Sequence, residues 1–187
     1  MEDDAGDDRQ FSQAATLRDG TPVTLRAMRP DDRERIVAAF SKLDAGTVYT
    51  RFFSFRKELP GSALDRISDI DFDRLAGLVV TIGSGNAETV IGSATYVASV
   101  ASDGTNVAEV AFTIEEDYQR QGLAGKLLAA LATLARRHGI ARFVAEVLAG
   151  NASMLAVFER SGLPMRRRRE DGVVHVTLDL APQARPL

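Results

Sequence analysis

The stretch that most constrains this chain is residues 108–128, which read AEVAFTIEEDYQRQGLAGKLL. An apolar, strand-like run ends at Ile114, a turn containing glycine follows, and a helix rich in alanine and leucine begins after it. The first turn of a helix leaves main-chain N–H groups without partners, and the helix dipole adds about half a positive charge there. Gly122 and Gly125 have no Cβ, so a phosphate group can approach the main chain closely. The pattern predicts an anion-binding turn between a strand and a helix.

Two common phosphate-binding motifs do not fit this turn. A Walker loop requires G-x-x-x-x-G-K-[ST], whereas Lys126 follows a different glycine spacing and precedes Leu127. The dinucleotide motif G-x-G-x-x-G is also missing, because only Gly122 and Gly125 are present in the turn. The turn therefore belongs to another class of phosphate site.

A third pattern does fit the same residues. Gln119, Gly122 and Ala124 occupy the three specified places of Q/R-x-x-G-x-G/A, the acyl-CoA signature of the GNAT family of N-acetyltransferases. Downstream, Asn151 opens the segment NASMLAVFERSGL, which resembles the second CoA-contacting helix of that family. Because the two motifs occur in the expected order and separation, the chain resembles a GNAT N-acetyltransferase.

This resemblance implies acetyl-CoA as the cosubstrate and assigns roles around the turn. In the family, two neighbouring strands splay apart, and the pantetheine arm of the cofactor enters the gap between them. The first strand would face the arm with its main chain, the turn would hold the diphosphate, and Asn151 would contact the arm from the other side. Asparagine is also a favoured helix N-cap, and the two roles are compatible. The residues assigned to cofactor binding are Phe112, Thr113, Ile114, Gln119, Arg120, Gln121, Gly122, Leu123, Ala124, Gly125, Lys126 and Asn151.

Acetyl transfer to an amine also needs a base, because a lysine amine with a pKa near 10.4 is almost entirely protonated at pH 7. A carboxylate whose pKa is raised by burial is well suited to take that proton. Glu109 resembles the general base of Pat-type protein lysine acetyltransferases, a branch of the family, and Glu146 lies on the next strand, where other branches carry theirs. Glu109 is favoured over Glu146. The family often has a tyrosine seven residues after the asparagine to protonate the leaving thiolate, and here that position is Phe158.

These features predict an enzyme that transfers acetyl from acetyl-CoA to a primary amine by direct attack. Residues 49–55 (YTRFFSF) and the AEVAF segment resemble Pat-type proteins, so a protein lysine is the favoured acceptor. One alternative is acetylation of a small-molecule amine. Another is a non-catalytic acyl-CoA-binding module, which the missing hydroxyl at Phe158 supports. A KH-type nucleic-acid loop at residues 122–125 is a third reading, and the net charge of −3 opposes it.

Composition limits which other classes of protein the chain can belong to. At 187 residues, with 45% apolar and 26% charged residues, the sequence is typical of one soluble globular domain. No apolar run approaches the roughly 20 residues that span a bilayer, the acidic start has no signal-peptide core, and there is no cysteine. We expect a cytoplasmic monomer or homodimer without membrane or nucleic-acid partners. His138 and His175 lie far apart without ligand spacing, so no metal site is expected.

The order of elements predicts an α/β chain with the GNAT fold, in which a mixed, mostly antiparallel sheet of about seven strands has a splayed central parallel pair and flanking helices. Three strands from residue 75 to residue 114 should form an antiparallel meander, and a crossover helix should place the next strand parallel to the last of them. Strands are expected at 23–28, 75–82, 89–100, 107–114, 142–148, 165–169 and 173–180, and helices after Pro30 and at 49–55, 62–70, 122–138 and 153–160.

The predicted domain limits follow from charge. Residues 1–14 carry five acidic side chains and almost nothing apolar, so they are expected to be a disordered acidic tail. The acetyltransferase domain should span residues 15–181, and residues 182–187 should be a C-terminal tail.

Overall fold

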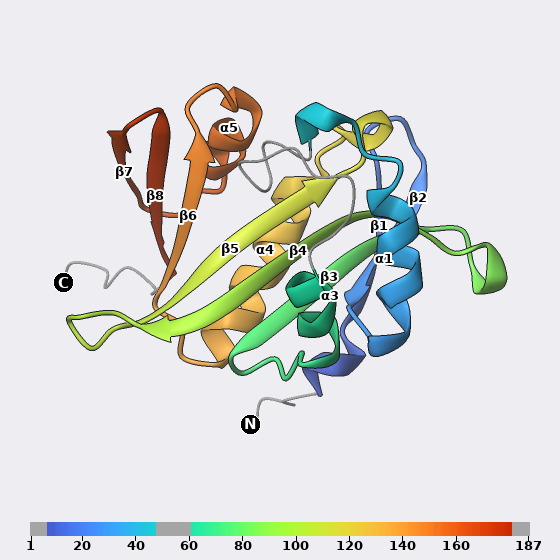
Figure 1. Ribbon diagram of the computed structural model, residues 1–187, viewed down its shortest axis with the longest axis horizontal. Helices are drawn as coiled ribbons and strands as arrows, with labels where there is room; N and C mark the ends of the chain where they lie inside the picture. Colours follow the sequence, from blue (N-terminus) through green and yellow to red (C-terminus); the bar gives the residue numbers. More distant parts are fainter. Residues whose placement is uncertain (1–6, 48–60, 181–187) are drawn as a thin grey trace.

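The computed structural model describes residues 7–47 and 61–180, which form an eight-stranded mixed sheet with helices on both faces (Figure 1). The strand order is β1-β2-β3-β4-β5-β6-β8-β7, in which β3, β4 and β5 form the predicted antiparallel meander and β5 and β6 the predicted parallel pair. The strands are β1 (Ser12–Thr16), β2 (Pro22–Ala27), β3 (Leu75–Ile82), β4 (Thr89–Val100), β5 (Asn106–Ile114), β6 (Arg142–Leu148), β7 (Met165–Glu170) and β8 (Val173–Asp179).

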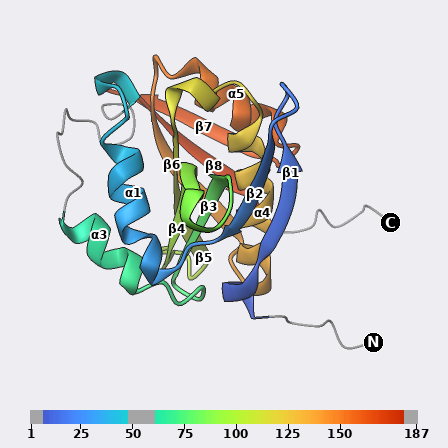
Figure 2. The ribbon, with the colours of Figure 1, turned by 90° about the vertical axis from the view of Figure 1, so that its right-hand side faces the viewer.

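Helices cover the two faces of the sheet (Figure 2). Helix α4 packs on one face against β3, β4 and β5, with α5 beside it, and helices α1 and α3 lie on the opposite face. The apolar stripe predicted for α4 is in the core, because Leu127, Leu131 and Leu134 are fully buried. Within residues 7–47 and 61–180, no helix is both long and apolar enough to cross a membrane. The helices are α1 (Arg33–Phe40), α3 (Gly61–Ser68), α4 (Leu123–Arg137) and α5 (Ala152–Arg160), and the 3-10 helices are η1 (Asp8–Gln10), η2 (Pro30–Asp32), η3 (Gly85–Ala87) and η4 (Glu116–Tyr118).

The N-terminal segment departs from the sequence prediction. The expected disordered tail reaches residue 14, whereas Asp8–Gln10 is a 3-10 helix and Ser12–Thr16 is a strand paired with β2. This strand raises the number from about seven to eight. The apolar residues of strand β1 are two adjacent alanines, and four of its five residues are exposed at the sheet edge. The strand therefore lacks the apolar alternation by which strands are recognised. The tail prediction is wrong for residues 8–14, and residues 1–6 lie outside the described residues.

The other predicted elements within the described residues are present, and the ends predicted by residue number agree to within two residues. The helix expected after Pro30 begins as the 3-10 helix η2 and becomes α1 at Arg33. The predicted helix at 49–55 and the C-terminal tail at 182–187 lie outside the described residues.

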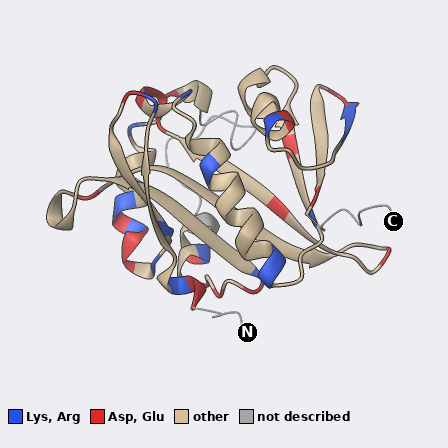
Figure 3. Cartoon of the chain, turned by 180° about the vertical axis from the view of Figure 1, so that it is seen from behind, with Lys and Arg blue, Asp and Glu red and all other residues tan. Residues whose placement is uncertain are grey.

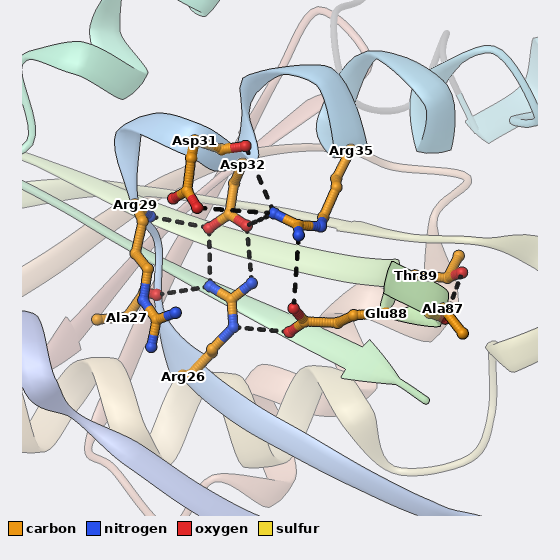
Figure 4. A network of polar contacts seen from close by, with 9 residues as sticks. All are labelled: Arg26, Ala27, Arg29, Asp31, Asp32, Arg35, Ala87, Glu88 and Thr89. Carbon is orange, nitrogen blue, oxygen red and sulfur yellow. Dashed lines mark hydrogen bonds and ion pairs between the residues drawn. The ribbon is translucent and has the colours of Figure 1, made fainter. Parts of the chain in front are cut away.

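A buried ion-pair network fixes helix α1 on the sheet (Figure 4). Arg26 of β2 donates from both Nη atoms to the two carboxylate oxygens of Asp32 at 2.7 Å, and from Nε to Glu88 at 2.9 Å. Arg35 of α1 lies 3.5 Å from Asp32 and 4.0 Å from Glu88. Arg26 and Asp32 are only 4% and 0% exposed. Because Asp32 is the N-cap of α1 and Glu88 precedes β4, the network holds this end of the helix over β4.

Two opposing effects act on the carboxyl group of Asp32. Burial disfavours its charged form, but hydrogen bonds from Arg26 and from the main-chain amide of Arg29 outweigh burial and hold its pKa below the usual value. A group with a lowered folded-state pKa stabilises the fold fully above its unfolded pKa, about 3.9 for aspartate. That contribution is lost as the pH falls through the lower folded-state pKa of Asp32.

We expect Asp32→Asn to lower the free energy of unfolding by about 3 kcal/mol at pH 7, because it removes one partner of a buried ion pair. Asp31→Asn is the matched control, since its carboxylate is 71% exposed and reaches Arg35 only at 3.9 Å. The control should lose less than about 0.5 kcal/mol. Urea unfolding followed by circular dichroism measures both losses. The difference between wild type and Asp32→Asn should shrink below about pH 4, and equal losses for the two variants at pH 7 contradict this role of the network.

Candidate functional site

The central feature of the candidate site is a gap between β5 and β6. The parallel ladder joins only residues 107–109 to residues 142–144. Beyond it, β5 stays paired with β4 as far as Ile114, and β6 stays paired with β8 as far as Leu148, so the two strands diverge (Figure 1). This divergence confirms the predicted splayed pair. Within residues 7–47 and 61–180, it leaves one main-chain edge of each strand without a partner strand.

The direction of the main chain decides which residues of β5 face the gap. The amide of Glu115 donates to a carbonyl of β4 at 3.0 Å, and main-chain groups alternate in direction along a strand. Thr113 therefore directs its main chain to β4, whereas Phe112 and Ile114 direct theirs to the gap. The Ile114 carbonyl already accepts a hydrogen bond from Gln119 Nε2 at 3.0 Å. Of the three strand residues predicted to face the cofactor arm, Phe112 presents both of its main-chain groups.

The turn between β5 and α4 is held in a specific shape. Gln119 ties it to the end of β5, and Arg120 and Gly122 have φ angles of +60° and +89°. Helix α4 begins without a side-chain cap. The main-chain amide of Lys126 donates the first helical hydrogen bond, to the Gly122 carbonyl at 3.2 Å. The amides of residues 123–125 precede that bond, so they are the open donors at the positive end of the helix dipole. An anion is the ligand that this arrangement suits.

Asn151 lies across the gap from this turn, after β6 and at the N-cap of α5. Its Oδ1 accepts a hydrogen bond from the Met154 amide at 3.1 Å, which is the capping role expected of asparagine. Its side-chain nitrogen has no hydrogen-bond partner in the part of the chain that the structure describes. Asn151 can therefore cap the helix and donate to a ligand in the gap at the same time.

Phe158 closes the floor of the gap. It is 1% exposed and meets Phe112 edge-on, with the ring centroids 6.0 Å apart. The position that carries a tyrosine in many members of the resembled family is therefore part of the apolar core here and offers no proton.

The parallel register places both candidate bases on the same face of the sheet. Glu109 is paired with Val144, and Glu146 lies two residues further along β6. The Glu146 side chain is 57% exposed, and its Oε1 lies 3.4 Å from His175 Nδ1. Glu109 is also exposed, has no hydrogen-bond or ion-pair partner among residues 7–47 and 61–180, and lies where the gap begins. This geometry favours Glu109 as the carboxylate that meets a ligand in the gap.

A hollow between α1 and the sheet contains a carboxylate that the sequence analysis missed. Burial raises the pKa of Glu115, Lys42 opposes that shift, and Asp117 and Glu116 add to it. Glu115 lies at the turn end of β5, six residues and about 20 Å of extended strand from Glu109. In the sequence it is one of three acids close together, and nothing distinguishes it from its neighbours. The hollow is lined by Ile36, Ala39, Phe40, Leu43, Val90, Ile91, Gly92, Ser93, Thr113 and Glu115.

A second missed residue is Arg18, whose Nη1 donates to the Arg120 carbonyl in the turn at 3.1 Å. The two residues are 102 positions apart, so no local sequence signal links them.

The most basic run of the chain does not belong to the gap. Arg166–Arg169 lies on the edge strand β7 (Figure 3). All four of these arginine side chains are exposed. Ion pairs join Arg166 to Asp179, Arg167 to Glu159 and Arg168 to Glu170. The run is therefore a largely neutralised outer edge.

Comparison with known proteins agrees with this geometry. Residues 23–164 match the acetyltransferase (GNAT) domain family. The chain is 32% identical over 166 residues to acetyltransferase Pat of Mycolicibacterium smegmatis, covering 89% of this chain and 48% of that protein. It is 30% identical over 162 residues to an acetyltransferase of Pseudomonas aeruginosa, covering 86% of each. The GNAT domain of S. lividans PAT has a TM-score of 0.80 at 34% identity, covering 90% of this chain and 96% of that domain. The chain thus spans about half the length of the mycobacterial Pat.

The two glycines of the turn give opposite predictions for the unliganded protein. Gly122→Ala puts a Cβ on a residue with φ +89° and should lower the free energy of unfolding by about 1–2 kcal/mol. A Cβ on Gly125, inside α4, meets no atom within 4 Å, so Gly125→Ala should raise the free energy of unfolding by up to about 1 kcal/mol.

The added methyl of Gly125→Ala should nevertheless weaken acetyl-CoA binding about tenfold by crowding the helix mouth. Thermal unfolding and calorimetric titration separate the two effects. A Gly125→Ala protein that is more stable and binds acetyl-CoA as tightly as wild type contradicts a phosphate site at this glycine.

Proposed function

The chain belongs to the GNAT acetyltransferase family, whose cosubstrate is acetyl-CoA, and we propose that it transfers the acetyl group to the side-chain amine of a protein lysine. The observation that carries the proposal is the edge of β5 that faces the gap. It runs from an anion-binding turn to Glu109, whose carboxylate has no partner among the described residues. Five residues, about 17 Å of strand, separate Ile114 from Glu109. A diphosphate at the turn and an extended arm along this edge direct the thioester toward Glu109.

The residues around the gap supply the contacts that acetyl-CoA needs. The amides of residues 123–125 suit the diphosphate, with Arg120 and Lys126 adding positive charge. Phe112 offers an N–H and a carbonyl to the amide groups of the pantetheine arm, in the way that an edge strand binds an extended peptide. Asn151 donates from the opposite side of the gap. The arm thereby takes the place of the missing ladder between β5 and β6.

Glu109 then acts on the acceptor. At neutral pH the lysine is an ammonium ion and cannot attack. Glu109, directly or through one water, takes a proton, and the neutral nitrogen attacks the thioester carbonyl carbon. A C–N bond forms, the C–S bond breaks, and the second proton of the nitrogen passes to the departing thiolate or to solvent. A thiol with a pKa near 8.5 is a tolerable leaving group without an acid, so the absence of a hydroxyl at Phe158 is compatible with this reaction.

Two observations support a lysine acceptor. The AEVAF segment around Glu109 resembles Pat-type protein lysine acetyltransferases, and the chain is similar to the mycobacterial Pat. The hollow beside α1 also opens on the face of the sheet that carries Glu109, because Thr113 and Glu109 share strand parity. Because Glu115 lies about 20 Å of extended strand from Glu109, this hollow suits a residue that flanks the acceptor lysine in a protein substrate, rather than the lysine itself.

The alternatives predict different products. The purified protein should be incubated with acetyl-CoA and either a bacterial protein extract or a panel of small amines, with mass spectrometry of the products. We expect acetyl-lysine in the proteins. Acetylated small amines alone favour a small-molecule acetyltransferase, and no product from a protein that binds acetyl-CoA favours a non-catalytic module, for which Phe158 is the supporting observation.

We expect Glu109→Gln to lower kcat by about 100-fold or more while leaving the Kd of acetyl-CoA unchanged, because only proton transfer loses its base. Glu146→Gln is the matched control on the same face of the sheet, and its kcat should stay within about threefold of wild type. Steady-state kinetics and calorimetric titration measure both effects. A loss confined to Glu146→Gln assigns the base to Glu146, and wild-type turnover in both variants rules out either glutamate.

A further inference from the structure

Arg18 sits in the tight turn that joins β1 to β2. Leu17, its neighbour, is 3% exposed and anchors the turn in the core. The Leu17 amide donates to the Thr21 carbonyl at 2.9 Å, and the Thr21 amide donates to Asp19 Oδ1 at 2.9 Å. Because this turn is closed by its own hydrogen bonds, Arg18 projects from a defined position.

The hairpin also lies along helix α4, so the position of Arg18 relative to that helix is fixed (Figure 2). At the C-terminal end of α4, Asp8 is 2.7 Å from His138 Nε2 and 2.8 Å from Arg137 Nη1. Between the two ends, a groove is lined by Phe11, Gln13, Ala15 and Leu25 of the hairpin segment and by Lys126, Ala129, Ala130 and Thr133 of α4. The N-terminal segment is thus tied to the last turn of α4, and its hairpin turn reaches the first.

At that first turn, the Arg18 guanidinium lies against the phosphate-binding loop. Its Nη1 donates to the Arg120 carbonyl at 3.1 Å. A Cβ placed on Gly122 would be 4.0 Å from Arg18 Nε. The guanidinium therefore lies beside the main chain of the glycine turn, at the mouth of α4.

The hydrogen bond to Arg120 has a consequence for the loop. Arg120 has φ +60°, a conformation that is uncommon for a residue with a side chain. Its carbonyl is held toward Arg18, and in a planar trans peptide the next N–H, that of Gln121, points the opposite way. Arg18 therefore fixes the orientation of one peptide group in the turn that must receive the diphosphate.

The charge of Arg18 is also uncompensated. Among residues 7–47 and 61–180, no carboxylate lies within ion-pair distance of Arg18, Arg120 or Lys126. The adjacent carboxylate of Asp19 accepts a hydrogen bond from the Thr21 amide, and hydrogen bonds from Thr21 lower the pKa of Asp19. An arginine has five N–H donors in a planar fork that matches phosphate oxygens, and the contact with Arg120 uses one of them.

We propose that Arg18 is a binding residue for the diphosphate of acyl-CoA, contributed by the β1–β2 hairpin rather than by the glycine turn itself. The inference rests on the proposed function, because it places that diphosphate at the mouth of α4. Arg18 orients the turn through the Arg120 carbonyl and contributes its remaining donors and its charge to the phosphates. The N-terminal hairpin is then part of the cofactor site.

The test uses Arg18→Gln, which removes the charge, and Arg18→Lys, which keeps the charge but not the fork. Arg74→Gln is the matched control, since the Arg74 side chain is 87% exposed and its ion-pair partner among the described residues is Asp71 at 3.7 Å. Each full-length protein is titrated calorimetrically with CoA and with S-acetylpantetheine, which lacks the diphosphate and the nucleotide. Melting temperatures of the unliganded variants check that the fold is intact.

We expect Arg18→Gln to weaken CoA binding at least about tenfold, the range of a lost charge-assisted hydrogen bond, and to leave S-acetylpantetheine binding unchanged. Arg18→Lys should lie between Arg18→Gln and wild type, and Arg74→Gln should match wild type. The dependence of the CoA Kd on salt should become shallower in Arg18→Gln, because one cation is lost.

Wild-type affinity of Arg18→Gln for CoA overturns this inference and leaves the proposed function intact. An equal loss for CoA and S-acetylpantetheine also overturns it, because the residue would then act elsewhere than on the phosphates. Failure of the wild-type protein to bind CoA overturns the proposed function and this inference together.

Discussion

Beyond Glu109 and Val144, the hydrogen-bonded ladder between β5 and β6 stops, although both strands continue. Main-chain groups left without partners in a sheet are costly unless water or a ligand satisfies them. The divergence is sustained because each strand keeps its outer neighbour, β4 for β5 and β8 for β6. Phe112 and Phe158 fill the space beneath it. The gap is thus a break in pairing that the surrounding sheet supports, and it provides the open edge on which the site is built.

The helices on the two faces of the sheet have different roles around this gap. On one face, the apolar stripe of α4 fixes the helix whose first turn presents open amides beside the gap. On the other face, the buried pair of Arg26 and Asp32 holds α1 over β4 and so forms a wall of the hollow that contains Glu115. Buried ion pairs contribute little net stability compared with apolar packing, but they are exacting in geometry. Such a pair therefore fixes where α1 lies more than it adds to stability, and the position of α1 shapes the hollow beside it.

Helix α4 is constrained at both of its ends by the same short N-terminal segment. Asp8 pairs with His138 and Arg137 at the last turn, where the helix dipole favours positive charge, and Arg18 contacts the loop before the first turn. His138 Nδ1 also lies 2.7 Å from Asp73, so the imidazole sits between two carboxylates. These contacts join segments that are distant in sequence to the helix on which the proposed cofactor site depends.

The strand, glycine turn and helix at residues 108–128 could be predicted from the sequence because the causes are local. Residues a few positions apart decide strand alternation, the left-handed conformation at Gly122 and the apolar spacing of α4. The same holds for the meander and the capping role of Asn151. Strand alternation alone does not distinguish Glu109 from Glu146, because side chains alternate between the two faces of the sheet in the same way on both strands. The sequence favoured Glu109 through its resemblance to Pat-type proteins.

Other features depended on which distant segments pack together. Strand β1 has no apolar alternation of its own and forms because β2 offers it an edge to pair with. Asp8, which precedes the strand, ties the same segment to the end of α4 by ion pairs. Three further features likewise arise only when remote residues are brought together: the partial burial of Glu115, the pairing of Glu146 with His175 and the contact of Arg18 with Arg120. Turns, caps and strand alternation depend on residues that are close together in the sequence, so they could be predicted from the sequence alone. Burial and charge pairing depend on which distant segments pack together, so they became known only from the tertiary structure.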